Sequence, residues 1–70
     1  MDRNEYLKLC RRCAMGDEGA RVRCRFGEYK PWGYRLTFDK EGNARNTAIL
    51  RDLQHPFSLL DVEVEKVESI

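Results

Sequence analysis

Two stretches of alternating side chains decide the fold of this chain: Ala20-Arg21-Val22-Arg23-Cys24-Arg25-Phe26 and Leu60-Asp61-Val62-Glu63-Val64-Glu65. Side chains two residues apart in an extended strand point to the same face, so each stretch has one apolar face and one charged face. Both stretches therefore read as half-buried strands. The charged face of the first is basic and that of the second is acidic, which predicts that the two strands pair side by side.

Helical spacing marks the beginning of the chain. Asp2 is a predicted N-cap with Glu5 as its capping-box partner, and apolar residues follow at intervals of three and four up to Gly16. The clearest turn signal is Asp39-Lys40-Glu41-Gly42-Asn43. We expect a helix over residues 3–15 and strands over residues 20–26, 34–39, 44–51 and 59–67.

These elements predict a single α+β domain over residues 1–70, with the N-terminal helix packed on a small antiparallel sheet of four to five strands. Two architectures satisfy this description. One is a curled sheet of the SH3-like barrel kind, in which the first and last strands meet, and the other is an open sheet with the helix on one face. The opposite charges of the first and last strands favour the curled form.

Composition places the chain among soluble globular proteins. Of its 70 residues, 41% are hydrophobic and 36% are charged, which is too apolar for a disordered segment. No apolar run approaches the roughly 20 residues of a membrane span, and the first residues do not resemble a secretory signal. Three cysteines are an odd number for a disulfide framework. We expect a cytoplasmic protein with reduced thiols and no membrane association.

Charge is distributed unevenly along the chain. Residues 1–36 hold nine Lys and Arg against five Asp and Glu, a net charge of +4, whereas residues 37–70 hold four against seven, a net charge of −3. The sum is only +1. Proteins that bind a nucleic-acid backbone usually carry a clear basic excess, because their affinity comes largely from neutralised phosphates. The near-neutral balance argues against such a role as the main function.

Catalytic and metal-binding patterns are weak in this sequence. Cys10 and Cys13 have the C-x-x-C spacing, and Cys24 with His55 would complete a zinc ligand set. The pair lies on the apolar stripe of the predicted helix, however, where cysteine behaves as a small hydrophobic residue. His55, the only histidine, has no evident partner for acid–base work. We expect no enzyme activity, no metal and no cofactor.

A binding surface is the remaining functional signal. The segment from residue 29 to residue 35 combines aromatic and cationic side chains with Gly and Pro. Trp, Tyr and Arg are the residue types that dominate interface hot spots. Trp32 is either surface or core, and Tyr29 is the aromatic residue that we expect to be more exposed. The predicted partner-binding residues are Tyr29, Lys30, Trp32, Tyr34 and Arg35. The alternative nucleic-acid-binding residues are Arg21, Arg23 and Arg25.

Several segments together resemble a known group of proteins. They are the helix opening Asn4-Glu5-Tyr6-Leu7 with Cys10, the strand and turn from Tyr34 to Asn43, residues 46–53 with Ser58, and the ending Val64-Glu65-Lys66-Val67-Glu68. The group is that of small uncharacterised accessory proteins of phages and mobile elements of Gram-positive bacteria, which the chain resembles over most of its length. The resemblance implies action in the host cell cytoplasm by binding host or phage macromolecules, sometimes to block host defences. The row Arg21, Arg23, Arg25 departs from it.

Two functional hypotheses follow, with a third beside them. The first is a non-enzymatic protein-binding module, such as a phage-encoded inhibitor of a host defence protein, with a homodimer as one of its forms. The second is a nucleic-acid-binding small barrel, which requires the arginine row to be free of the acidic strand. The third is a sponge for small signalling nucleotides, which would use the aromatic and arginine cluster as a pocket. The first is the preferred hypothesis.

Overall fold

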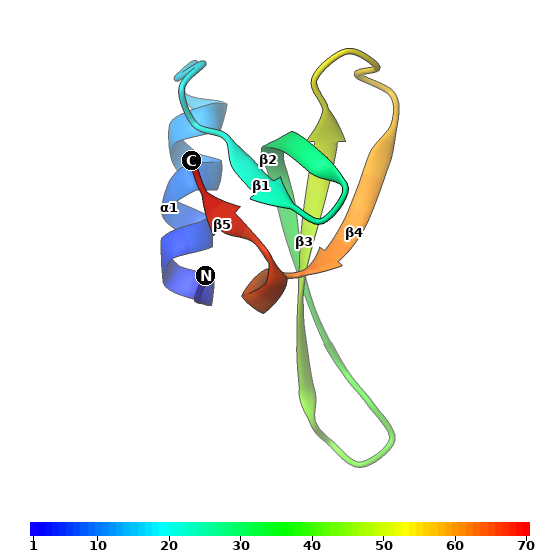
Figure 1. Ribbon diagram of the computed structural model, residues 1–70. Helices are drawn as coiled ribbons and strands as arrows, with labels where there is room; N and C mark the ends of the chain where they lie inside the picture. The colour runs from blue at the N-terminus through cyan, green and yellow to red at the C-terminus, as the bar shows by residue number, and fades with distance from the viewer.

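The chain is an α+β protein in which one helix packs on a five-stranded antiparallel sheet, as the computed structural model of residues 1–70 shows (Figure 1). This confirms the predicted fold class. The elements are α1 (Arg3–Ala14), β1 (Val22–Cys24), β2 (Gly27–Phe38), β3 (Ala44–Asp52), β4 (Leu59–Glu63), the 3-10 helix η1 (Val64–Lys66) and β5 (Glu68–Ser69).

Helix α1 begins where its capping signal predicts. The Asp2 carboxylate accepts a hydrogen bond from the backbone N–H of Glu5 at 2.8 Å, and the chain leaves the helix at Gly16, whose φ of 93° suits glycine. Tyr6 and Leu9 are its buried residues and pack against the sheet. With 12 residues, α1 is too short and too polar to cross a membrane.

The strand order is β4-β3-β2-β1-β5, and it corrects two expectations. The basic strand β1 does not pair with the acidic strand β4; it lies between β2 and the short β5. Strand β4 follows β3 through a short loop and forms a hairpin with it, which places it at the far edge. Because β4 and β5 are not paired with each other, the sheet is not closed into a barrel.

The last predicted strand, residues 59–67, ends early: β4 stops at Glu63 and η1 follows it directly. Val62 and Val64 keep the alternating pattern of β4, but the next buried residue, Val67, comes three positions later. An interval of three fits a 3-10 turn and not a strand. The chain therefore turns at residues 64–66 and returns along β1.

Strand β2 begins at Gly27 and not near residue 34, so residues 27–33, which lie between the predicted strands 20–26 and 34–39, are also strand. The ladder to β3 continues through it with a register shift between Pro31 and Gly33, which makes Trp32 an extra, bulged residue. At the other end, the predicted strand 20–26 shortens to three residues because Arg25 and Phe26 form a two-residue turn before Gly27, whose φ is 121°.

The core lies between α1 and the concave face of the sheet. Its buried side chains come from α1, from the sheet and from the segments that connect them: Tyr6, Leu9, Ala20, Val22, Cys24, Ala48, Leu50, Val62, Val64 and Val67. The N-terminal ammonium of Met1 donates to the carbonyl oxygen of Val67 at 3.0 Å and so holds the start of the chain against its end.

One part of the sheet extends beyond this core. Strands β2 and β3 continue as a two-stranded ribbon that projects away from α1 and the other strands (Figure 1). We call residues 34–46 the hairpin arm. No other strand pairs with β2 beyond Tyr29 on the β1 side, and β4 reaches only to Thr47 on β3. The arm gives the molecule its elongated shape, 38 × 21 × 18 Å.

Candidate functional site

The structure separates the predicted partner-binding residues between the two faces of β2. Tyr29 and Tyr34 are half-buried and pack against the core, whereas Trp32 is 52% exposed. Trp32 is therefore a surface residue, and the expectation that Tyr29 is the more exposed of the two is wrong. Lys30 and Arg35 alternate with the core-facing residues and lie on the outer face, away from α1.

Trp32 belongs to a compact surface cluster on the outer face. The guanidinium of Arg51 lies over the indole ring, 4.3 Å from its centroid, a cation–π arrangement. Leu59 of β4 is the register partner of Arg51 and is exposed beside it. We call Trp32, Arg51 and Leu59 the tryptophan patch. It crosses three neighbouring strands at the end of the sheet opposite to the hairpin arm.

The guanidinium of Arg51 is fixed from a second side. Its Nε donates to the carbonyl oxygen of Pro56 at 2.9 Å, in the loop between β3 and β4. Phe57, the next residue, is almost fully exposed. This loop therefore presents a third apolar side chain, after Trp32 and Leu59, next to the residue that binds Arg51.

Asp52 orders the same loop. Its carboxylate accepts the backbone N–H groups of Gln54 at 2.8 Å and His55 at 2.9 Å. These two bonds hold the pKa of the Asp52 carboxyl below its usual range, because they stabilise the charged form. The Asp52 N–H also donates to the carbonyl oxygen of Ser58 at 3.1 Å, which closes the loop. His55 lies at an exposed loop position and has no side-chain hydrogen bond.

The bulge that presents Trp32 is held from below by α1. The phenol of Tyr6, which is fully buried, lies 2.7 Å from the carbonyl oxygen of Gly33 and 3.1 Å from that of Ile49. These two residues are register partners directly after the bulge. Burial raises the pKa of the Tyr6 hydroxyl above its usual range, so the group stays a neutral donor. Helix and bulge are thus joined by the core residue with the largest side chain.

Charged groups next to the patch are neutralised within the chain. The Lys30 ammonium lies 3.2 Å from a Glu18 carboxylate oxygen, and the Arg35 guanidinium lies 3.1 Å from that of Asp61. Each pair is exposed and contributes little to stability. The two ion pairs matter more for binding than for stability, because they keep the outer face from being strongly basic.

The arginine row has a different environment from the one expected. Arg23 pairs with Glu28 of β2 at 3.3 Å, and the Arg25 guanidinium lies 4.7 Å from the centroid of the Phe26 ring. Arg21 is half-buried, and its Nε is buried without a hydrogen-bond partner. The acidic strand β4 lies on the other side of β2 and β3. Arg21 and Arg25 are therefore free of ion pairs.

The thiols and the histidine do not form a metal site. Nowhere in the chain do three His, Cys, Asp or Glu side chains lie close enough to share a metal ion. Cys24 is buried, Cys10 and Cys13 are half-buried, and none forms a disulfide. Burial raises the pKa of the Cys10 thiol, which lowers its nucleophilicity at neutral pH.

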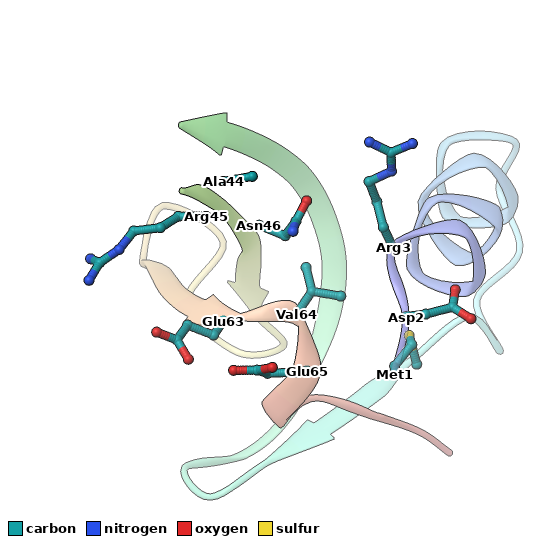
Figure 2. A pocket seen from close by; sticks show the side chains of 9 residues that line it. All are labelled: Met1, Asp2, Arg3, Ala44, Arg45, Asn46, Glu63, Val64 and Glu65. Carbon is teal, nitrogen blue, oxygen red and sulfur yellow. The ribbon is translucent and has the colours of Figure 1, made fainter. Parts of the chain in front are cut away.

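A groove of about 450 Å³ separates the beginning of α1 from β3 and η1 (Figure 2). Asn46 and Val64 lie on the wall that faces Met1 and Arg3, whereas Arg45 points away from the helix (Figure 2). The Asn46 amide oxygen accepts a hydrogen bond from the Tyr34 hydroxyl. The groove lies at the root of the hairpin arm and contains none of the predicted partner-binding residues.

Two members of the tryptophan patch were not among the predicted site residues. Arg51 and Leu59 lie far from Trp32 in the sequence, and only the pairing of three strands brings them together. The available signal was the alternation of Leu50 and Arg51, which places the arginine on the outer face. Comparisons of the chain with protein-family models, with curated proteins and with solved structures found no match.

Proposed function

We propose that this chain is a non-enzymatic protein-binding module that contacts its partner through the tryptophan patch. The observation that carries the proposal is the half-exposed Trp32 at a bulge, with the Arg51 guanidinium stacked on its ring and Leu59 beside it. Tryptophan and arginine are the residues most enriched in interface hot spots. A single tryptophan kept at the surface of a chain with a small core is an apolar area that a partner would cover.

The rigidity of the patch supports the proposal. Trp32, Arg51 and Leu59 come from three paired strands, and Tyr6 holds the bulge from the core side. A preorganised surface loses little conformational entropy on binding, so more of the contact free energy appears as affinity. Lys30 and Arg35 each form an ion pair with a carboxylate of the same chain, which also supports a protein partner over a polyanion.

The sequence resemblance supports a particular kind of partner. The resemblance to small accessory proteins of phages and mobile elements implies binding of host or phage macromolecules, and of these two we propose that the tryptophan patch binds and inhibits a host protein.

Affinity capture with two matched variants tests the proposal. Trp32→Ala removes the central side chain of the patch, and Phe26→Ala removes an aromatic side chain of similar exposure, 54% against 52%, at the arginine row. We expect a protein that remains bound to the wild type and to Phe26→Ala after nuclease treatment and that is lost with Trp32→Ala. The fluorescence of Trp32, the single tryptophan of the chain, should then change when the purified partner protein is added. Equal capture by all three forms would contradict the proposal.

A second function, nucleic-acid binding, is favoured by one specific observation. The acidic strand β4 does not lie against the arginine row, which leaves Arg21 and Arg25 without ion pairs and Arg25 beside the exposed ring of Phe26. Cations with an adjacent aromatic ring are the usual components of single-strand binding surfaces. If this function holds, the same capture experiment without nuclease should recover nucleic acid. The recovery should fall steeply with added salt, because phosphate contacts release counterions. It should be lost with Phe26→Ala and kept with Trp32→Ala.

A further inference from the structure

The hairpin arm has an open backbone edge. Strand β1 pairs with residues 27–29 of β2 and no further, so residues 34–38 have β3 on one side and no strand on the other. None of the hydrogen bonds made by turns, loops or side chains reaches the backbone of residues 34–38. An edge of this kind offers unpaired N–H and C=O groups to another chain.

The alternation of the ladder identifies the unpaired groups. The N–H of Asp39 donates to the carbonyl oxygen of Asn43 at 3.0 Å, which makes these two residues a hydrogen-bonded pair. Such pairs alternate along an antiparallel ladder, so Thr37 and Arg35 are bonded to β3. The backbone groups of the residues between them point to the open edge. Those residues are Tyr34, Leu36 and Phe38.

The same three side chains form the inner face of the arm together with Ala44 and Asn46 of β3, and the part of this face near the turn is apolar. Leu36 is 42% exposed and Phe38 is 65% exposed, because α1 covers only the base of the hairpin. The other edges of the sheet are protected in ways typical of natural proteins. Strand β4 carries Asp61 and Glu63 on its outer face, and β5 has only two residues. The edge formed by residues 34–38 is longer than β5 and carries one charged side chain on its outer face, Arg35, where β4 carries two.

We propose that a second copy of this chain pairs antiparallel with the open edge of the arm, β2 against β2, with Thr37 on the two-fold axis. The sequence from residue 35 to residue 39 complements itself in this register. On the inner face Leu36 of each chain lies opposite Phe38 of the other, an apolar pair. On the outer face the two Thr37 side chains meet. Arg35, which pairs with Asp61 of its own chain at 3.1 Å, lies opposite Asp39 of the other copy, so that a second carboxylate of opposite charge comes beside it. Pairs of all three kinds stabilise antiparallel sheets.

The backbone groups satisfy this register as well. Leu36 and Phe38 both direct their N–H and C=O to the edge, so the two reciprocal Leu36–Phe38 pairs supply four hydrogen bonds between the chains. Asp39 is suited to its place because its carboxylate accepts the N–H groups of Glu41 and Asn43, each at 2.9 Å, and remains ionised. The contact lies at the opposite end of the sheet from the tryptophan patch and leaves that patch free.

Cross-linking tests the register, with a control on the neighbouring strand. The Cα atoms of a pair that is not hydrogen-bonded are about 4.5 Å apart, which lies within the disulfide range of roughly 4.4–6.8 Å. We expect Thr37→Cys to form a covalent dimer under mild oxidation through the two introduced thiols, as peptide mapping would show. Arg45→Cys, at the register partner of Thr37 on β3, should give little dimer. Both substitutions would be made with Cys10 and Cys13 replaced by Ser.

Sedimentation velocity tests the dimer without cross-linking. We expect the wild type to sediment as a species of twice the chain mass of 8.3 kDa. Thr37→Lys places two ammonium groups opposite each other and should raise the dissociation constant about tenfold or more. A wild type that is monomeric up to millimolar concentration would overturn the proposal. So would a dimer in which the cysteine variants at residues 37 and 45 cross-link equally, because another face would then hold the two copies together.

Discussion

The base and the arm of the β2–β3 hairpin are built from the same two strands and share one backbone ladder. They differ in how far their side chains are buried and in whether other strands flank them. At the base, Ala48 and Leu50 are fully buried beneath α1, and β1 and β4 flank the hairpin. In the arm, Leu36 and Phe38 point to the same face as those two residues and remain exposed. A hydrogen-bonded ladder is therefore not what stabilises the base. An apolar layer across the sheet makes the difference, since two strands alone are marginally stable in water.

Removing the side chain that covers the base should have the largest effect. Tyr6→Ala deletes a fully buried ring in contact with the core, a change that typically costs about 3–5 kcal/mol. A domain of this size rarely has more than about 3–5 kcal/mol in total. We expect Tyr6→Ala to be largely unfolded by circular dichroism at 25 °C. A cooperative unfolding transition close to that of the wild type would contradict this.

Removing only the hydroxyl should have an intermediate effect. Tyr6→Phe keeps the ring but loses the contacts with Gly33 and Ile49, which we expect to lower the free energy of unfolding by about 1–2 kcal/mol in urea titrations. Tyr29→Phe is the matched control, because the half-buried Tyr29 hydroxyl makes no hydrogen bond within the chain. Equal losses in the two variants would show that the bond to the bulge is not what matters.

The loss of stability at low pH should differ between the base and the arm, because each contains one aspartate with a lowered pKa. Hydrogen bonds from backbone N–H groups hold the pKa of Asp52, at the base, and that of Asp39, in the arm, below the usual range. A carboxyl with a lowered pKa in the folded state stabilises the fold above its unfolded pKa and loses that contribution as the pH falls through the folded value. Thermal stability should therefore decline below about pH 4.

Asparagine keeps the acceptor oxygen at each position and removes the titration. We expect Asp52→Asn to abolish more of the acid-induced decline than Asp39→Asn does, because the turn of the arm can open while the base stays folded. Melting curves of both variants between neutral and acidic pH would measure this. Equal effects would mean that the arm opens only together with the base.

Shortening an arm side chain should have the smallest effect on the isolated fold. Phe38→Ala removes a ring that is mostly in water, so we expect a change within about 0.5 kcal/mol in the unfolding of the monomer. Hydrogen exchange should separate the two regions in the same sample, with the amides of Thr37 and Arg45 exchanging faster than that of Leu50. Protection of the arm equal to that of the base, in a monomeric sample, would contradict the comparison.

Local patterns predicted most of the individual elements. Asp2 and Glu5 predicted the start of α1, the turn at residues 39–43 predicted the hairpin, and alternation predicted which side chains of β1 and β4 are buried. These signals come from neighbouring residues, so the sequence contains them directly. They were sufficient for the fold class.

Relations between distant segments were not predictable in the same way. The opposite charges of β1 and β4 favoured a pairing that does not form, because exposed ion pairs contribute too little to override the short connection between β3 and β4. The Gly and Pro around Trp32 indicated either a turn or a bulged connection, and the sequence did not show that the bulge lies within one continuous strand. For the site, Trp32 was predicted as a candidate, whereas Arg51 and Leu59 required the strand order.

The position of β5 has a consequence for how the molecule is made. The β2–β3 hairpin joins residues close in sequence and can form early on a growing chain. The core cannot close until Val67 has left the ribosome and β5 has paired with β1, and the Met1 ammonium finds its acceptor 66 residues away. During synthesis, the apolar face of the sheet therefore stays partly uncovered until residues 67–69 have been made, and a nascent-chain chaperone would meet the hairpin before it meets the fold.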